Sequence, residues 1–376
     1  MNSASTSKRH VLHVFATFVP AGPQTRTANV LEALGSSWRH TIVAMDNRTS
    51  ASELLAEDLE ITLRDAPPQA GFFKTLRALR TMIQEVAPDL ICTYNWGAIE
   101  TVLAVRSLTG IPLIHHEEGF GPEEAASFKK RRVWMRRFLF KRVPALIVPS
   151  HNLGKIARDL WRVPERQLHI VPNGVHLSRF GPRGADMREQ LALPPDAVVV
   201  GSVGHLRPEK NYGRLIEAMA SATARTQVPL HLVLVGDGVE RSHLEELAQT
   251  LGLKERVHFT GHQENTAPAY RTFDIFCLSS DTEQMPISLI EAMATGIPPV
   301  ATDVGDIRLM VPTESRANIV SKDLCPLALA DQLVLLANDK DVRMSLGRAA
   351  EAKARELYGF DKMLAIYKGL YESLLF

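Results

Sequence analysis

The sequence predicts an α/β protein built from two Rossmann-like parallel-sheet domains that face an interdomain cleft. Short apolar runs alternate with longer helical patterns along nearly the whole chain, which is typical of parallel sheets covered by helices. This alternation occurs twice, before and after a polar segment with glycine and proline at 176–185. The length of 376 residues also suits two domains.

The first domain is expected to cover residues 1–175, with the C-terminal helix at about 358–376 packing back on it. Helical patterns at Thr25–Leu34 and Phe72–Glu85 lie between short apolar runs. The expected strands are His10–Phe15, His40–Ala44, Leu90–Thr93, Leu113–His116, Ala145–Val148 and His169–Val171.

The second domain is expected at residues 176–357 and repeats the alternation. Its predicted helices are Tyr212–Ala222, Glu240–Leu251 and Pro286–Thr295. Its predicted strands are Val198–Val203, Leu230–Val235, Val257–Thr260, Ile275–Leu278 and Pro299–Ala301. Parallel sheets bind ligands at the carboxyl ends of their strands, so the loops that follow these strands are the expected functional segments.

The composition excludes several classes of protein. The chain has 43 Lys and Arg against 42 Asp and Glu, a near balance that argues against a protein that coats nucleic acid. No run approaches the roughly 20 apolar residues of a membrane span, and the N-terminus lacks the features of a signal peptide. Three well-separated cysteines (Cys92, Cys277 and Cys325) suit a reducing compartment, so the cytoplasm is the expected location.

The segment Ser279–Val300 (SSDTEQMPISLIEAMATGIPPV) carries two glutamates beside a predicted helix. Pro286 suits the first helical turn and Gly296 suits the C-terminal cap. Glu283 then precedes the helix, and Glu291 lies in its second turn. A helix N-terminus favours an anion, so two carboxylates beside it fit a sugar nucleotide, one for sugar hydroxyls and one for the ribose. The alternative is that both are solvated charges.

The segment Gly201–Tyr212 (GSVGHLRPEKNY) follows a predicted strand directly. The small residues Gly201 and Gly204 are expected to let a ligand approach the backbone. Arg207 and Lys210 follow in a turn, where they would neutralise a diphosphate leaving group. The alternative is an ordinary solvated basic turn.

Together with three further segments, these two resemble the retaining GT-B glycosyltransferases of family 4, the glycosyl transferases group 1. The further segments are VPNGV at 171–175, LVGDG at 234–238 and VATDVG at 300–305. The resemblance runs from about residue 10 to the C-terminal helix, and its specificity comes from R-x-x-K and E-x7-E in the correct order. The segment at 88–97 (PDLICTYNWG) is similar to a subgroup associated with exopolysaccharide assembly.

The resemblance implies a role for each matching residue. Glu283 would contact the donor sugar near the reaction centre, and Glu291 would bind the ribose. Arg207 and Lys210 would bind the donor diphosphate. The implied donor-binding set also includes Asn173, Gly204, Gly22, Met285, Pro286 and Ile287.

Three positions depart from the family pattern. Gly22 falls where the family has a Gly-Gly loop near the phosphates, but here Ala21 precedes it. Gln284 stands where glycine commonly follows the first glutamate. Glu118 occupies the usual place of a site histidine, and His116 lies two residues earlier on the same face of an extended segment. Either Glu118 or His116, or Glu117 between them, is expected to position or deprotonate the acceptor hydroxyl; the alternative for His116 is a packed strand-end histidine.

A segment at 128–142 holds eight basic residues in pairs, separated by aromatic and aliphatic ones. On a helix this gives a basic face and an apolar face, the composition of an interfacial membrane helix. The residues expected at a membrane surface are Lys129, Lys130, Arg131, Arg132, Trp134, Arg136 and Arg137. The alternative is a helix packed on its own domain with a solvated basic face.

The combined prediction is a hexosyltransferase-type enzyme that moves a sugar from a nucleotide-diphosphate sugar to a hydroxyl acceptor with retention, in cell-surface polysaccharide or glycolipid biosynthesis. The expected partners are a nucleotide sugar, a carbohydrate or lipid-linked acceptor and an anionic membrane surface, with no nucleic acid. No metal cofactor is expected, and the histidines lack zinc-ligand spacing. The expected location is the cytoplasm, with peripheral attachment to the inner face of the membrane.

The sequence is also compatible with two alternative functions. One is a sugar-nucleotide epimerase on the same scaffold. The other is a non-catalytic glycosyltransferase-like binding protein, to which the departures at Ala21, Glu118 and Gln284 point.

Overall fold

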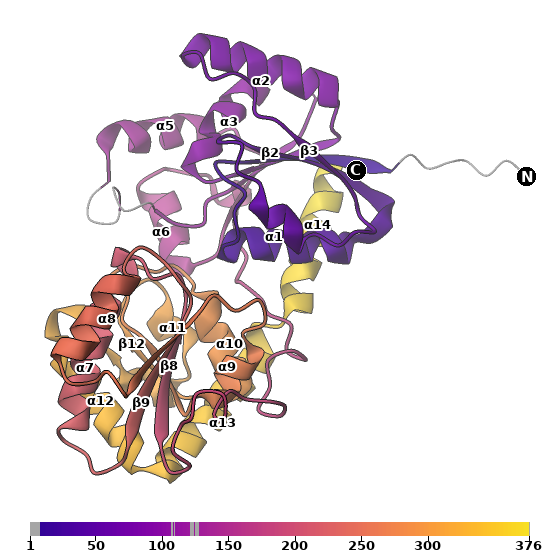
Figure 1. The fold of residues 1–376 in the computed structure, drawn as a ribbon. Coiled ribbons are helices and arrows are strands. Elements are labelled where there is room, and N and C mark those ends of the chain that lie inside the picture. The colour runs from indigo at the N-terminus through magenta and orange to yellow at the C-terminus, as the bar shows by residue number, and fades with distance from the viewer. Residues whose placement is uncertain (1–7, 107, 109, 121–123, 125–127, 376) are drawn as a thin grey trace, which may run out of the picture. The chain divides into compact units, whose positions relative to one another are not determined.

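The computed structural model describes residues 8–106, 108, 110–120, 124 and 128–375. The chain divides into two compact units (Figure 1). The first contains the chain up to Pro172 together with Met363 onward, and the second contains Asn173–Lys362. Among the described residues, no helix is both long enough and apolar enough to cross a bilayer.

The first unit is built on a parallel sheet with the strand order β3-β2-β1-β4-β5-β6-β7. Its strands are β1 (Arg9–Phe15), β2 (Trp38–Ala44), β3 (Glu60–Arg64), β4 (Leu90–Tyr94), β5 (Leu113–His116), β6 (Ala145–Val148) and β7 (Leu168–Ile170). The helices of this part of the chain are α1 (Gly22–Leu34), α2 (Phe72–Val86), α3 (Ile99–Val105), α5 (Lys130–Phe140), α6 (His151–Asp159) and most of α14 (Phe360–Leu375).

The second unit repeats the plan with a parallel sheet in the order β10-β9-β8-β11-β12-β13. Its strands are β8 (Val198–Val203), β9 (Leu230–Val235), β10 (Val257–Gly261), β11 (Ile275–Leu278), β12 (Pro299–Thr302) and β13 (Ile319–Val320). Its helices are α7 (Tyr212–Thr223), α8 (Arg241–Thr250), α9 (Ala267–Thr272), α10 (Ile287–Thr295), α11 (Ile307–Met310), α12 (Leu327–Asn338) and α13 (Lys340–Leu357).

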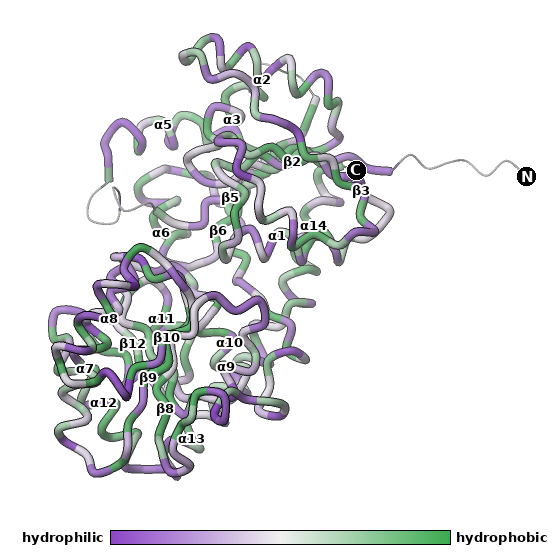
Figure 2. The backbone as a smooth tube through the Cα atoms, in the orientation of Figure 1, coloured by the Kyte–Doolittle hydropathy of each residue, from purple (hydrophilic) through white to green (hydrophobic). Residues whose placement is uncertain are grey.

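The predicted strands are confirmed to within two residues at their ends, and two further strands were missed. Continuous apolar runs marked the inner strands because both of their faces are buried, as the largely hydrophobic strands in Figure 2 show. In contrast, β3 is a partly exposed edge strand with alternating polar residues. The other missed strand, β13, is only 2 residues long. Neither strand has the long continuous run of apolar residues that marks a strand buried on both faces.

In each sheet the strand order reverses once, between β1 and β4 in the first unit and between β8 and β11 in the second. Loops that follow the two central strands diverge at such a point and leave room for a ligand at the sheet edge. In the second unit these loops are Gly204–Asn211, after β8, and Ser279–Pro286, after β11. The R-x-x-K turn and the first glutamate of E-x7-E therefore lie at the same switch point.

Glycines bring the loops of the second unit into close contact. A Cβ on Gly236 would lie 2.1 Å from the carbonyl oxygen of Gly204, and one on Gly238 would lie 2.4 Å from that of Leu206. The GDG sequence after β9 thus lets two loops touch. The interpretation of Gly201 as a point of ligand approach is wrong, because the ring of Phe273 fills the space beside it. A Cβ on Gly201 would lie 2.1 Å from Cγ of that ring.

We expect Gly236→Ala to lower the free energy of unfolding by roughly 2–4 kcal/mol, because the new methyl group meets backbone at a residue with φ of 133°. Gly252→Ala is the matched control. Gly252 also has positive φ (71°) but faces open space, so its substitution should cost only about 1 kcal/mol. Urea unfolding measures both, and equal losses would contradict the packing role of Gly236.

Candidate functional site

The R-x-x-K turn of the second unit is shaped by its own residues. Arg207 precedes a short 3-10 turn at Pro208–Lys210, where proline presets the backbone. Asn211 follows in the left-handed conformation, and its side chain accepts a hydrogen bond from the backbone N–H of Arg214 at the start of α7. The sequence RPEKN therefore ends the loop after β8 and caps the next helix.

Lys210 and Glu283 form an ion pair at the β8/β11 switch point. The Nζ of Lys210 lies 2.6 Å from Oε1 of Glu283, and the hydroxyl of Ser280 donates to the same oxygen at 2.8 Å. The two loops are also joined by the Ser279 hydroxyl, which donates to the Lys210 carbonyl at 3.1 Å. The structure thus brings together two predicted site residues that are far apart in sequence.

Arg207 differs from Lys210 in its surroundings. Its side chain is 49% exposed, and the carboxylate of Glu209 lies 4.0 Å from its Nη1. The guanidinium can therefore turn toward a bound anion at little desolvation cost, and its planar fork suits phosphate oxygens.

The predicted helix at Pro286–Thr295 is confirmed as α10, with Pro286 at its N-cap and Gly296 in the left-handed conformation at its C-cap. The N-cap residue Pro286 forms no side-chain cap hydrogen bond, so the first N–H groups of α10 can bind another acceptor. Asn173 holds the loop before the helix, since its side-chain amide donates to the Met285 carbonyl at 2.8 Å. Asn173 therefore positions Met285 and Pro286.

The backbone beside Glu283 is closely packed. A Cβ on Gly305 would lie 2.2 Å from the Glu283 carbonyl oxygen, and the N–H of Asp306 donates to the Gln284 carbonyl at 3.0 Å. The VATDVG segment thus supports the loop that carries the first glutamate. Gln284 lies outside the positive-φ region, so its backbone does not require the glycine common in the family.

Glu291 points from α10 toward α9, where the Tyr270 hydroxyl donates to its Oε2 at 2.7 Å. Burial raises the pKa of Glu291 from 4.5 to about 7, although the bond from Tyr270 and the charge of Arg179 partly offset this effect. A carboxyl poised near neutrality can accept hydrogen bonds from ribose hydroxyls once it ionises.

In the first unit, Glu118 forms a buried ion pair that the sequence did not predict. Nη1 of Arg26 lies 2.8 Å from Oε2 of Glu118, and Nη2 contacts the other carboxylate oxygen. The two side chains are 3% and 7% exposed. The N–H of Glu118 donates to the side chain of Asn95 at 2.8 Å. The position that holds a histidine in the family therefore carries a neutralised carboxylate here.

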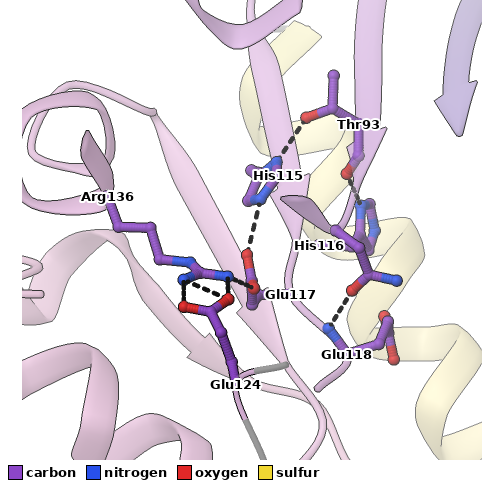
Figure 3. Close-up of polar contacts among 8 residues, drawn as sticks. Thr93, His115, His116, Glu117, Glu118, Glu124 and Arg136 are labelled. Carbon is purple, nitrogen blue, oxygen red and sulfur yellow. Dashed lines mark hydrogen bonds and ion pairs between the residues drawn. The ribbon is translucent and has the colours of Figure 1, made fainter. Parts of the chain in front are cut away.

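His116 is buried and neutral. Its Nδ1 donates to the Thr93 carbonyl at 3.3 Å (Figure 3), and its ring stacks on Tyr94 with centroids 4.4 Å apart. Burial, followed by the nearby charge of Arg26, holds the pKa of His116 well below its ordinary value. The ring can orient a hydroxyl but is a poor proton acceptor at neutral pH.

Glu117 is the centre of a separate buried network. It accepts from Arg136 at 2.7 Å and lies 3.2 Å from Nε2 of His115, while Arg136 also binds both carboxylate oxygens of Glu124 at 3.2 Å (Figure 3). Burial alone would raise the pKa of Glu117, but the bonds from His115 and Arg136 hold it below its ordinary value. Glu117 is thus enclosed and structural.

The prediction of Arg136 as a membrane-surface residue is wrong. Its side chain is 1% exposed and is fixed by Glu117 and Glu124, because α5 turns this position toward β5. Arg132 is only partly exposed, since it binds Glu124 at 2.9 Å. The other predicted surface residues, Lys129, Lys130, Arg131, Trp134 and Arg137, are exposed.

The PDLICTYNWG segment supplies supports for this region. Tyr94 stacks on His116, and Asn95 accepts the N–H of Glu118. The ring of Trp96 lies under the guanidinium groups of Arg132 and Arg136, 5.0 and 4.8 Å from its centroid. Each of these three side chains therefore contacts a charged or polar group at the end of β5 or after it.

Gly22 begins α1, with Ala21 at the N-cap and Pro23 in the first turn. The helix therefore starts without a flexible glycine pair. Sequence reasoning missed Arg26 and Tyr270, the partners of Glu118 and Glu291. Only their placement by the fold reveals them, since each lies on a different element from its partner. Arg26 on α1 reaches Glu118 in the loop after β5, and Tyr270 on α9 reaches Glu291 on α10.

The chain contains two doubly wound parallel sheets in series. An Arg/Lys turn and two glutamates lie at the switch point of the second sheet. This combination defines a protein of the GT-B class. Residues 185–353 match the family model described as glycosyl transferases group 1, and residues 21–174 match the glycosyl transferase 4-like domain. The chain belongs to the group 1 glycosyltransferase family.

Curated relatives cover most of the chain. It is 28% identical to EpsF of Bacillus subtilis over 316 residues, or 80% of each chain. It is 30% identical to the D-inositol 3-phosphate glycosyltransferase of Corynebacterium urealyticum over 84% of this chain and 78% of the relative. A UDP-Gal:alpha-D-GlcNAc-diphosphoundecaprenol alpha-1,3-galactosyltransferase of Escherichia coli is 28% identical over 64% of each chain.

Solved structures share the GT-B fold. HepE of Anabaena, in complex with UDP-glucose, matches 97% of this chain and 99% of its own with a TM-score of 0.82 and 18% identity. Sucrose-phosphate synthase of Thermosynechococcus elongatus matches 97% and 99% with a TM-score of 0.80 and 22% identity.

We expect Arg136→Ala to lower the free energy of unfolding by roughly 3–5 kcal/mol, because Glu117 would be left buried without its arginine and Glu124 would keep only Arg132. Arg131→Ala, on the exposed side of α5, should change it by less than about 0.5 kcal/mol. Urea unfolding compares the two. Similar values for both variants would show that the buried network contributes nothing to stability.

We expect Glu291→Gln to stabilise the protein above pH 7. The folded state resists ionisation of Glu291, whose pKa rises from 4.5 to about 7, so stability falls as the pH rises through this range. The variant should gain on the order of 3 kcal/mol at pH 8 and less than about 1 kcal/mol at pH 5. Denaturant unfolding at both pH values measures this, and a gain independent of pH would exclude the titration as its cause.

Proposed function

We propose that the protein transfers a hexosyl group from a nucleotide-diphosphate sugar to a hydroxyl acceptor with retention of anomeric configuration. The observation that carries the proposal is the joining of Lys210 and Glu283 at the β8/β11 switch point, 2.6 Å apart, with Arg207 in the same turn. Family membership supports the reaction class.

In this reaction the bond between the anomeric carbon and the diphosphate breaks while positive charge develops on the sugar. Arg207, Lys210 and the N–H groups at the start of α10 would stabilise the departing diphosphate. The acceptor oxygen then bonds to the anomeric carbon from the same face, and its proton passes to the leaving phosphate oxygen. Glu283 would orient sugar hydroxyls, and Glu291 would accept hydrogen bonds from the ribose.

UDP-hexoses are the first donors to test, because HepE is described in complex with UDP-glucose and one relative by its name uses UDP-Gal. A carbohydrate or lipid-linked acceptor is proposed, in polysaccharide or glycolipid biosynthesis. In the first unit, Glu118 and His116 would orient the acceptor. The exposed cations of α5 would hold the protein on an anionic membrane surface at the cytoplasmic side, each contributing about 1 kcal/mol near the bilayer.

We expect Arg207→Ala and Lys210→Ala each to lower turnover at least about 100-fold, because each removes a charge that stabilises the leaving group. The donor would first be chosen from nucleotide-diphosphate sugars by thermal shift, since a ligand of the native state raises its stability. Transfer is then followed by chromatography of the product.

Arg225→Ala is the control, because Arg225 pairs with Asp331 on the exposed surface of the second unit. It should retain full turnover. Normal rates in both site variants would refute the assignment of Arg207 and Lys210. NMR of the donor without acceptor distinguishes transfer from epimerisation, and the absence of transfer and hydrolysis with every donor that binds would favour a binding protein.

A further inference from the structure

A groove in the first unit lies between the end of α3 and the segment that follows α5. It has a volume of about 340 Å³, near the lower end of small-molecule sites. Its walls are largely aliphatic and include Val102, Val105, Ile111 and Leu113, and two arginines, Arg106 and Arg142, also line it. None of the described residues that line the groove is acidic. An apolar groove with two cations attracts an anion that carries an apolar part.

Arg106 is half-buried, and no carboxylate of the described residues forms an ion pair with it. Its Nη1 is buried without a hydrogen-bond partner among the described residues. The guanidinium instead lies over the ring of Phe138 on α5, with Cζ 4.5 Å from the ring centroid. A buried guanidinium nitrogen without an acceptor is costly, so an anion at this point would relieve that cost.

The groove opens beside exposed aromatic residues of α5. Trp134 and Phe138 are four residues apart on α5, so they share one side of the helix, and Arg142 in the turn after the helix lines the groove. Trp134 is 65% exposed and Phe138 47% exposed, and their rings stack with centroids 5.7 Å apart. Exposed tryptophan and phenylalanine beside lysine and arginine suit the headgroup region of a bilayer.

We propose that this groove binds one anionic phospholipid of the bilayer. Arg106 and Arg142 would hold the lipid phosphate, and the aliphatic wall would cover the first carbons of an acyl chain while Trp134 and Phe138 enter the surrounding headgroup layer. The proposal rests on the proposed membrane contact of α5, but it does not depend on the transfer reaction. In this proposal the groove recognises one lipid specifically, whereas the surface cations of α5 attract an anionic membrane only in a diffuse way.

The test uses monomeric short-chain lipids, which can enter the groove without a bilayer. Titration calorimetry measures binding of dihexanoyl phosphatidylglycerol below its micelle concentration, with dihexanoyl phosphatidylcholine and inorganic phosphate as comparison ligands. We expect the phosphatidylglycerol to bind most tightly. Arg106→Gln with Arg142→Gln should weaken it at least tenfold, and Ile111→Trp, which narrows the groove but keeps both charges, should weaken it similarly.

The matched control carries Lys129→Ser, Lys130→Ser and Arg131→Ser. It should bind the monomeric lipid normally but bind less to vesicles of phosphatidylcholine and phosphatidylglycerol. Folding of all variants is checked by circular dichroism and melting temperature. Unchanged lipid affinity in folded groove variants, or equal affinity of wild type for phosphatidylcholine or inorganic phosphate, would overturn the proposal. Unchanged vesicle binding by the control variant would contradict only the surface contact of α5.

Discussion

The parallel pairing of β8 with β11 is the constraint on which the candidate site of the second unit depends. Val200 and Gly201 pair with Ile275 and Phe276, so the two strands end at the same sheet edge although they are far apart in sequence. Glycine at position 201 leaves space for the Phe273 ring against β8. Lys210 and Glu283 then meet because the loops that carry them leave adjacent strands in the same direction.

In the first unit, buried charged side chains fix the sheet edge at which the strands end. Arg26 neutralises Glu118, and Arg136 and Arg132 together balance the charges of Glu117 and Glu124. Isolated charges at these places would be very costly, so each network is held by the penalty for breaking it. His116 stays neutral between them. The loop that follows β5 is therefore organised by fixed dipoles and paired charges.

The inner strands, the helix at Pro286–Thr295 and the charged turn at Arg207 could be predicted from the sequence because their signals are local. Buried strands are apolar throughout, and caps and turns have their own residues. The orientation of side chains within a basic run is not local. Arg136 looks like its neighbours in the sequence, but its partners Glu117 and Glu124 lie 19 and 12 residues away. The pairing of Arg26 with Glu118 could not be predicted for the same reason, because these residues are also far apart in sequence.

The anchoring of α5 by Arg136 has a consequence for how related chains diverge. Arg136, with the buried Leu139 and Phe140, holds the helix in place, so the exposed positions between Lys129 and Arg142 contribute less to the fold. Selection can therefore change the outer residues, while the buried arginine and its two carboxylates stay the same. Homologues should vary at Trp134 and Arg131 but change Arg136 only together with its acidic partners.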